Sequence, residues 1–514
     1  MSEYVIEMKN ITKRFSGRVA NDSVSIQIKK GEIYALVGEN GAGKSTLINI
    51  LFGRYEPDEG EIYVRGSKEI ISSSKYAAQL NIGMVPQHFE LVSEFTTTEN
   101  IILGRETQKK FLGMFPYVDL KGSREKIAEL SKQYGLEVNP VKRINEIGVS
   151  EQQRVEILKM LYKEAEILIF DESTAALMCQ EIESLLEIMK GLKSAGKTII
   201  FVTHKLEEVK KVADRCAILR KGKLVEVLDV ATTSVKEMAN KMVGREVSFE
   251  VEKTESHFGK EMLSVQNLTV KDKNGFPVVK NASFSIRQGE ILAIAGVSGN
   301  GQAELADAVA GLLPIAEGKI ILNGMDITHR SIRERIGKGI AYVPEKRQKY
   351  GLILDFSLTE NFLLKSYDTH PFSKKGILNK REGISLGEKL MEGYGIQSSQ
   401  GTKTKVGSLS GGNQQKAMIA RELEKDASFL ILVQPTGGLD IAARETVHKR
   451  IMEEREKGKA ILLISLELDE VMNLADTIAV IYSGEILKVA DVESLSRTEA
   501  GEIMMGVTGD EAKK

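Results

Sequence analysis

The sequence predicts two tandem α/β domains, each built on a largely parallel β-sheet. The chain has 514 residues, too many for one ordinary hydrophobic core. In each half, a β-branched apolar segment (33–37 and 291–295) runs into a glycine-rich loop and then a helix-like segment. Later in each half, apolar strand-sized segments alternate with charged helical ones, which is typical of a sheet covered by helices.

The two halves are copies of one domain. The offset between aligned positions drifts only from 258 to 263 residues, for Gly38 with Gly296, Ile147 with Leu409, Asp171 with Val433, and His204 with Glu467. One long offset indicates a duplicated domain and not a solenoid of short repeats. We expect domains at residues 1–245 and 261–507, joined by a short polar linker at 246–260.

The composition favours the cytoplasm and gives no support for nucleic-acid binding. The 71 basic side chains nearly cancel the 72 acidic ones, so no net field attracts nucleic acid. Cys179 and Cys216 are the only cysteines, too few for a disulfide framework or a zinc cluster. The first residues lack the apolar core of a signal peptide, and the apolar runs fall far short of the ~20 residues that span a bilayer. Any work at a membrane would need other chains to do the spanning.

The first glycine-rich loop, residues 38–46, reads GENGAGKST. Its glycines let successive backbone N–H groups turn toward a β-phosphate, Lys44 reaches the β- and γ-phosphates, and Ser45 offers a hydroxyl to Mg²⁺. The alternative is a strand-to-helix turn that merely needs glycines, but the flanking strand and helix are the context that the phosphate motif requires. The predicted phosphate-binding residues are Gly38, Glu39, Asn40, Gly41, Ala42, Gly43, Lys44, Ser45 and Thr46.

Three further strand-like segments end in polar side chains. Segment 167–172 ends in Asp171 and Glu172, one suited to the water shell of Mg²⁺ and the other to polarising an attacking water. Segment 199–204 ends in His204, which could contact a γ-phosphate, and Gln87 follows another strand and could bind Mg²⁺ and water. Taken singly, such residues are more often loop, cap or surface groups.

Residues 409–415 read LSGGNQQ and predict the start of a helix. Ser410 suits an N-cap, and Gly411 and Gly412 leave the helix N-terminus open to close approach by an anion. The plainer interpretation is a capped helix with a flexible entry.

Together these motifs resemble the ATP-binding cassette family over nearly the whole chain, in two copies. The resemblance identifies a Walker A loop at 38–46, a Q-loop at Gln87, a Walker B strand at 167–172, a switch histidine at His204 and a signature segment at 409–413. It implies two tandem P-loop ATPase domains, each with a mostly parallel sheet core, an antiparallel β subdomain and a helical subdomain. It also implies ATP and Mg²⁺ as cofactors.

The resemblance assigns roles to individual residues. It implies a catalytic set of Glu172, His204 and Gln87, and metal binding by Ser45, Gln87 and Asp171. It further implies that Phe15 stacks on adenine, and that nucleotide contacts come from Ser410, Gly411, Gly412 and Gln414.

In the family, two cassettes pair head to tail, so each ATP lies between the Walker motifs of one and the signature of the other. The first-half Walker motifs and the second-half signature would then form a complete site. The other site would be degenerate, with Gln302, Ala303, Val433, Gln434 and Glu467 in its Walker and switch positions, and Gly148 and Ser150 in its signature. This segregation predicts one hydrolytic site and one structural or regulatory site. Ser173 stands where the family usually has proline, so the rigid φ that proline would impose after Glu172 is missing, and we expect slower or looser catalysis.

Within the family, the intact first half and the second loop GVSGNGQ at 296–302 resemble the ATPase subunit of bacterial simple-sugar importers, and the GNGQ variant resembles the nucleoside branch. The resemblance implies a peripheral protein on the cytoplasmic face of the membrane. Its expected partners are two integral membrane permeases, near residues 87–90 and Glu345, and an extracytoplasmic solute-binding lipoprotein. The alternatives are a ribose or galactose importer ATPase, a nucleotide sensor without transport, and a soluble twin-cassette ribosome-associated ATPase. The broken second cassette and the short linker disfavour the last.

Overall fold

The computed structural model describes residues 3–15, 18–86, 89–111, 115–174, 177, 179–246, 253 and 257–507. The chain forms two compact units, Met1–Val247 and Ser248–Lys514. Gln87 lies outside the described residues, so its predicted role stays a prediction.

The first unit contains two principal sheets. Its strands are β1 (Tyr4–Phe15), β2 (Arg18–Lys29), β3 (Ile33–Val37), β4 (Glu59–Val64), β5 (Ser67–Glu69), β6 (Ile82–Val85), β7 (Gln108–Phe111), β8 (Phe115–Val118), β9 (Ile167–Asp171), β10 (Thr198–Thr203), β11 (Arg215–Arg220) and β12 (Lys223–Asp229). Its helices are α1 (Lys44–Leu51), α2 (Ser74–Gln79), α3 (Thr97–Ile102), α4 (Leu120–Tyr134), η1 (Ile144–Glu146), α5 (Val149–Tyr162), α6 (Cys179–Ser194), α7 (Leu206–Val212) and α8 (Val235–Val243).

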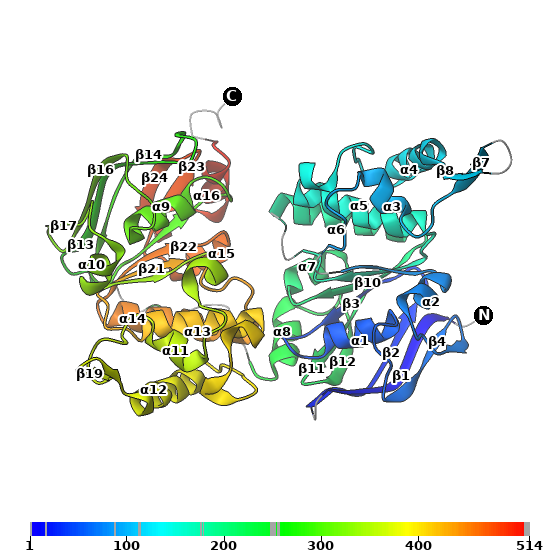
Figure 1. Ribbon diagram of the computed structural model, residues 1–514, viewed down its shortest axis with the longest axis horizontal. Helices are drawn as coiled ribbons and strands as arrows, with labels where there is room; N and C mark the ends of the chain where they lie inside the picture. The colour runs from blue at the N-terminus through cyan, green and yellow to red at the C-terminus, as the bar shows by residue number, and fades with distance from the viewer. Residues whose placement is uncertain are drawn as a thin grey trace. The chain divides into compact units, whose positions relative to one another are not determined.

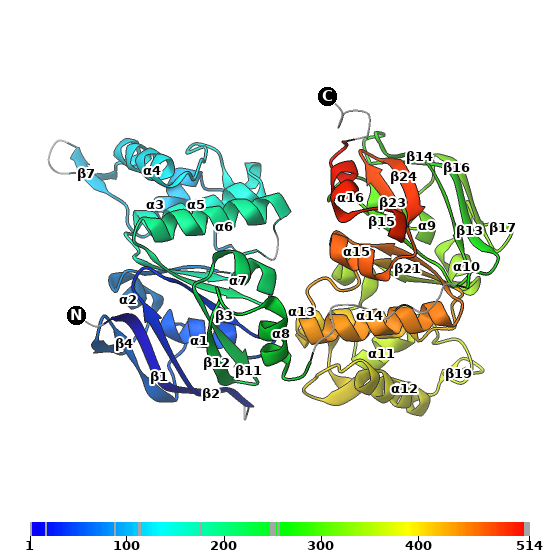
Figure 2. The ribbon, with the colours of Figure 1, turned by 180° about the vertical axis from the view of Figure 1, so that it is seen from behind.

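The central sheet of this unit has the strand order β12-β11-β3-β10-β9-β6. Its neighbours pair in parallel except for β11 with β12. A four-stranded antiparallel sheet has the order β2-β1-β4-β5. Helices α3 to α6 cover one face of the central sheet, and α1 with the antiparallel sheet covers the other (Figures 1 and 2). Alternate residues of β9 therefore enter two different cores: Ile167 and Ile169 pack toward α1, and Leu168 and Phe170 toward α5.

The second unit repeats this architecture. Its strands are β13 (Glu261–Lys271), β14 (Pro277–Arg287), β15 (Ile291–Ala295), β16 (Glu317–Leu322), β17 (Met325–Asp326), β18 (Ile340–Val343), β19 (Ser373–Lys374), β20 (Ile377–Leu378), β21 (Phe429–Val433), β22 (Ala460–Ile464), β23 (Thr477–Tyr482) and β24 (Glu485–Asp491). Its helices are α9 (Gln302–Ala310), α10 (Ile332–Gly337), η2 (Arg347–Gly351), α11 (Leu358–Leu363), α12 (Lys380–Gly393), η3 (Gly401–Lys403), η4 (Val406–Ser408), α13 (Gly411–Leu423), α14 (Ile441–Glu456), α15 (Leu468–Leu474), η5 (Val492–Ser494) and α16 (Arg497–Met504).

The strand order of the second central sheet, β24-β23-β15-β22-β21-β18, matches the first strand for strand. An antiparallel sheet, β14-β13-β16-β17, again packs on one face, and α13 and α14 lie on the other (Figure 1). The predicted fold class is confirmed: each unit has a mostly parallel core, an antiparallel β part and a helical part.

Candidate nucleotide site

The phosphate loop of the first unit connects β3 to α1. Every residue of β3 is buried, and α1 begins at Lys44 directly after Gly43. Gly43 has a φ of 99°, and a Cβ atom there would lie 2.3 Å from the carbonyl oxygen of Ala20 on β2. Only glycine fits a left-handed backbone this close to another segment. Asn40 and Gly41 are exposed at the tip, and Ala42 is buried beneath it.

Lys44 lies inside this loop. Its ammonium group donates to the carbonyl oxygens of Gly38 at 2.7 Å and Glu39 at 3.1 Å, and its side chain is only 4% exposed. The same nitrogen lies 3.8 Å from a carboxylate oxygen of Glu172. A phosphate cradled by the N–H groups of such a loop would meet this cation directly.

Asp171 and Ser45 bring two oxygen donors together at the end of β9. The Ser45 hydroxyl donates to the Asp171 carboxylate at 3.3 Å, and Asp171 is 5% exposed. Burial, reinforced by the neighbouring charge of Glu172, raises the pKa of Asp171 to about 6. A carboxylate and a hydroxyl are donors that suit Mg²⁺, so these residues fit the predicted metal role.

Glu172 follows Asp171 and differs from it in the direction of its pKa shift and in its backbone conformation. Its φ is 45°, and its N–H donates to the Val202 carbonyl of β10 at 3.0 Å. His204 and Lys44 hold the pKa of Glu172 below its ordinary value, against the opposing effect of burial. The His204 Nδ1 atom lies 3.8 Å from a carboxylate oxygen of Glu172. Two adjacent carboxyl groups with pKa values shifted in opposite directions suit two different roles.

Phe15 occupies the exposed end of β1. Its ring is 39% exposed and packs edge-on against Tyr55, with ring centroids 5.2 Å apart. The ammonium of Lys13 lies 5.7 Å from the centre of the Phe15 ring. This aromatic surface is open to a stacking partner, as its predicted role on adenine requires.

The second unit contains the signature segment with a serine cap. The Ser410 hydroxyl accepts a hydrogen bond from the N–H of Asn413, so the predicted N-cap is confirmed. Gln414, predicted to contact nucleotide, is buried, and its amide nitrogen donates to the carbonyls of Val406 at 3.1 Å and Leu409 at 3.3 Å. The Gln414 amide nitrogen therefore braces the loop that leads into α13.

In the first unit, α5 starts at Val149 after Gly148, which offers no side chain to cap the helix. Gln152 still braces the loop, because its amide donates to the carbonyls of Ile144 at 3.2 Å and Ile147 at 3.1 Å. The two signature helices thus share a loop brace and differ in the hydroxyl at the cap.

The glycine loop of the second unit keeps the backbone of the first but not its charge. Gly301 has a φ of 98° and precedes α9, as Gly43 precedes α1. Gln302, at the lysine position, is 4% exposed and donates to the Val297 carbonyl at 2.9 Å. Gln434, at the position of Glu172, has a φ of 49° and donates its N–H to the Ile464 carbonyl at 2.8 Å.

Glu467, at the position of the switch histidine, forms a two-point ion pair with Arg444 on α14, at 2.6 and 3.1 Å. The guanidinium of Arg444 offsets the negative charge of this carboxylate. Sequence reasoning missed the pair because 23 residues separate its members.

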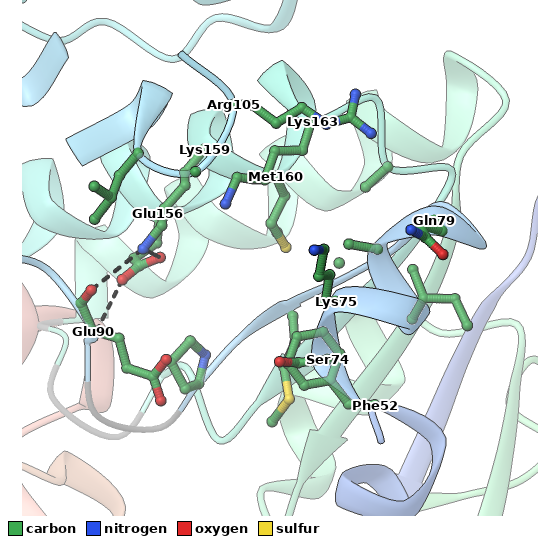
Figure 3. Close-up of a pocket in the computed structure, with 18 of the residues that line it drawn as sticks. Phe52, Ser74, Lys75, Gln79, Glu90, Arg105, Glu156, Lys159, Met160 and Lys163 are labelled. Atoms are coloured by element: carbon green, nitrogen blue, oxygen red, sulfur yellow. Dashed lines mark hydrogen bonds and ion pairs between the residues drawn. The ribbon is translucent and has the colours of Figure 1, made fainter. Parts of the chain in front are cut away.

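A groove of about 810 Å³ lies beside the loop that follows β6. Five basic side chains and two acidic ones line it: Arg54, Lys75, Arg105, Lys159, Lys163, Glu90 and Glu156. Figure 3 shows Lys75 on α2 opposite Lys159 and Met160 on α5. Buried Glu156 accepts the Glu90 N–H at 2.9 Å, and burial raises the pKa of Glu156. The charged side chains of the groove therefore include more basic than acidic groups, and Arg54 and Lys159 form ion pairs with Glu90 and Glu156.

Two further features near the site were not predicted from the sequence. Gln153 on α5 donates to the Ser173 carbonyl at 2.9 Å, directly after Glu172. Arg347 lies against the signature, where a Cβ atom on Gly411 would be 2.8 Å from the guanidinium. The repeat offset offered a signal for Gln153, since Gln415 occupies the equivalent position in the second half.

A phosphate loop with a buried lysine, next to one ionised carboxylate and a serine–aspartate oxygen pair, defines a nucleoside-triphosphatase site. The ABC transporter family model matches residues 21–175 and 279–437. The chain belongs to this family and, as one of its ATP-binding proteins, is an ATPase; the predicted family is confirmed. Among the described residues, no helix is long and apolar enough to cross a membrane.

The chain is similar to curated proteins over its full length. It is 49% identical to the guanosine import ATP-binding protein NupO of Bacillus subtilis, covering 100% of this chain and 99% of that protein. It is 47% identical to the nucleoside import ATP-binding protein NupA of Lactococcus lactis, covering 98% and 99%. It is 36% identical to the ribose import ATP-binding protein RbsA of Caldanaerobacter subterraneus, covering 99% and 100%.

A solved archaeal ribosome recycling factor, crystallised with a ribosomal stalk protein, also resembles the chain. The TM-score is 0.64, with 20% identity over 97% of this chain and 92% of that one. At this identity the likeness concerns the fold alone.

The raised pKa of Asp171 predicts a pH-dependent gain in stability for Asp171→Asn. Above pH 6 the buried charge costs roughly 3 kcal/mol, because the pKa rises from 3.8 to about 6. This cost is fully present above the pKa of Asp171 in the folded protein. It disappears as the pH falls toward the pKa of Asp171 in the unfolded chain. In thermal unfolding with EDTA and no nucleotide, we expect Asp171→Asn to be more stable than wild type at pH 7.5, with the difference shrinking between pH 6 and 4. A difference that grows on acidification would contradict the assigned shift.

Proposed function

We propose that the chain is the ATP-hydrolysing subunit of a nucleoside importer, with one hydrolytic nucleotide site and one that binds without cleaving. The observation that carries the hydrolytic assignment is the arrangement of Lys44, Asp171 and Glu172 within one sheet edge of the first unit. The nucleoside assignment rests on the full-length similarity to two nucleoside import proteins.

In the proposed reaction, ionised Glu172 takes a proton from water. The water oxygen forms a bond to the terminal phosphorus of ATP, and the bond from that phosphorus to the β-phosphate oxygen of ADP breaks. Lys44 neutralises charge on the phosphates, and Ser45 and Asp171 hold Mg²⁺, which when bound supplies further charge neutralisation. The His204 side chain lies near Glu172 and is suited to sense the terminal phosphate.

The asymmetry of the two halves supports one catalytic site. We infer head-to-tail pairing, in which Ser410, Gly411 and Gly412 complete the site of the first-unit phosphate loop. The opposite site would face Gly148, which lacks a capping side chain, and would contain Gln302 and Gln434. Its retained backbone geometry supports nucleotide binding, and its lack of a lysine and a base argues against hydrolysis.

A ribose-type importer is the second candidate within the family. The identity of 36% to a ribose import protein is lower than the 49% and 47% to nucleoside import proteins, which favours nucleosides. A ribosome-associated role rests on fold likeness at 20% identity and has no further support.

As an importer subunit, the chain would bind two integral membrane permeases at the cytoplasmic face of the membrane, and a solute-binding lipoprotein would deliver the nucleoside outside. The basic groove beside residues 89–90 is the surface that suits a permease. Its excess of Lys and Arg favours an acidic cytoplasmic segment.

The first prediction for this function concerns ATPase activity of the assembled transporter. Lys44→Ala and Glu172→Gln should each lower turnover by orders of magnitude, because one removes the phosphate cation and the other the base. Gln302→Ala and Gln434→Ala should change turnover by less than about tenfold, roughly 1.4 kcal/mol of barrier. Ser410→Ala should lower it more than Ser150→Ala. If Gln302→Ala and Lys44→Ala prove equally damaging, both sites are catalytic.

The substrate assignment predicts a transport phenotype. Deleting the gene from its host should abolish uptake of a radiolabelled nucleoside at micromolar concentration, and the wild-type gene should restore it while Lys44→Ala should not. Normal nucleoside uptake with lost ribose or galactose uptake would move the chain to the sugar branch.

The groove assignment predicts that charge reversal weakens permease binding. Lys75→Glu with Arg105→Glu, both exposed, should reduce co-sedimentation of the chain with permease-containing membranes by at least about fivefold, roughly 1 kcal/mol of binding. A matched control reverses Lys121 and Lys132, which are exposed on α4 outside the groove. Equal effects of the two double variants would show that general charge, and not the groove, controls association.

A further inference from the structure

The chain around Glu172 is held in a strained turn. A φ of 45° at a residue with a side chain costs on the order of 1–3 kcal/mol, so other contacts must maintain it. The N–H of Glu172 donates to Val202, and two residues later the Thr174 hydroxyl donates to buried Glu208 at 2.9 Å. Between them, the Ser173 carbonyl accepts the amide of Gln153 at 2.9 Å.

Gln153 contacts this turn from a different part of the chain. It is 3% exposed and belongs to α5, the helix that begins at the signature residues of the first unit. The Ser173 hydroxyl is buried without a hydrogen-bond partner among the described residues, so the serine side chain does not anchor the turn. The Gln153 amide is thus a polar contact that holds the Ser173–Thr174 peptide group, the second one after Glu172.

The second unit repeats the arrangement without the carboxylate. Gln415 on α13, also 3% exposed, donates to the carbonyls of Gln434 at 3.2 Å and Pro435 at 2.9 Å. Gln434 has the same left-handed backbone, and the Thr436 hydroxyl donates to buried Glu470 at 2.7 Å. The same scaffold therefore surrounds a side chain that cannot accept a proton.

We propose that Gln153 is a positioning residue for ATP hydrolysis: its hydrogen bond to the Ser173 carbonyl directs the Glu172 carboxylate toward the attacking water. This proposal rests on the proposed role of Glu172 as the base. Losing the bond frees the Ser173–Thr174 peptide group, so the strained turn at Glu172 relaxes and its carboxylate is displaced. A displacement near 1 Å at a reacting group costs up to about 100-fold in rate. The hydrogen bond from Gln153 does not involve Lys44 or the phosphate loop, which are the groups proposed to bind ATP. We therefore expect ATP binding to be unchanged when this bond is lost.

The test compares Gln153→Met with Gln415→Met in the assembled transporter. Methionine keeps the length and removes the donor, and the two sites share one architecture. We expect Gln153→Met to lower kcat by about 10- to 100-fold with the KM for ATP within about threefold of wild type, and Gln415→Met to leave kcat within about twofold. Equal losses in both variants, or an unchanged kcat in Gln153→Met, would overturn the proposal.

A second variant covers the case in which Gln153→Met folds poorly. Gln153→Glu donates to the Ser173 carbonyl only when it is protonated, so its kcat relative to wild type should be higher at pH 6 than at pH 8. A ratio that does not change with pH would count against positioning by this bond. Glu172→Gln, measured alongside, separates the two hypotheses. If Glu172→Gln retains turnover, the proposed base is wrong. If Glu172→Gln loses turnover while the Gln153 variants keep normal turnover, only the positioning role is rejected.

Discussion

The parallel register of β3, β10 and β9 determines where every charged group of the first site lies. Val37 pairs with Thr203, and Val202 pairs with Asp171, so the three strands end at one edge of the sheet. The phosphate loop, the two carboxylates and His204 all follow these ends. A slip of one residue in β9 would exchange its two core faces and move Asp171 to the wrong side, which the two cores on either face prevent. The packing that fixes the register of the sheet therefore also fixes the positions of the charged residues of the site.

The second unit keeps this strand arrangement without the charged residues of the first site. Gly301, Gln302 and Gln434 retain the turn, the inward side chain and the left-handed backbone of their counterparts, and yet the lysine and both carboxylates are gone. Arg444 compensates the new charge at Glu467. The positive φ at residue 434 is thus kept although its amide side chain cannot act as a base.

Much of the fold could be predicted from the sequence because strand periodicity, loop glycines and the repeat offset are local signals. The phosphate loop, the strand-end carboxylates and the Ser410 cap belong to this class. The inward direction of Gln414, the Arg444–Glu467 pair and the Gln153–Ser173 bond do not, because each depends on which surfaces meet after folding. Gln153 and Gln415 look like ordinary polar residues of an amphipathic helix, and only their burial distinguishes them.

The turn after Glu172 contains Ser173 where the second unit has Pro435. Serine leaves its own φ free, whereas a proline ring fixes it. In the structure the turn has a positive φ at Glu172 whose value, 45°, is close to the 49° of Gln434, which does precede a proline. Both turns receive a glutamine amide from the neighbouring helix and a threonine–glutamate bond from the next segment. These hydrogen bonds are common to both units, whereas the pyrrolidine ring is present in only one, so the positive φ before the ring position does not depend on proline.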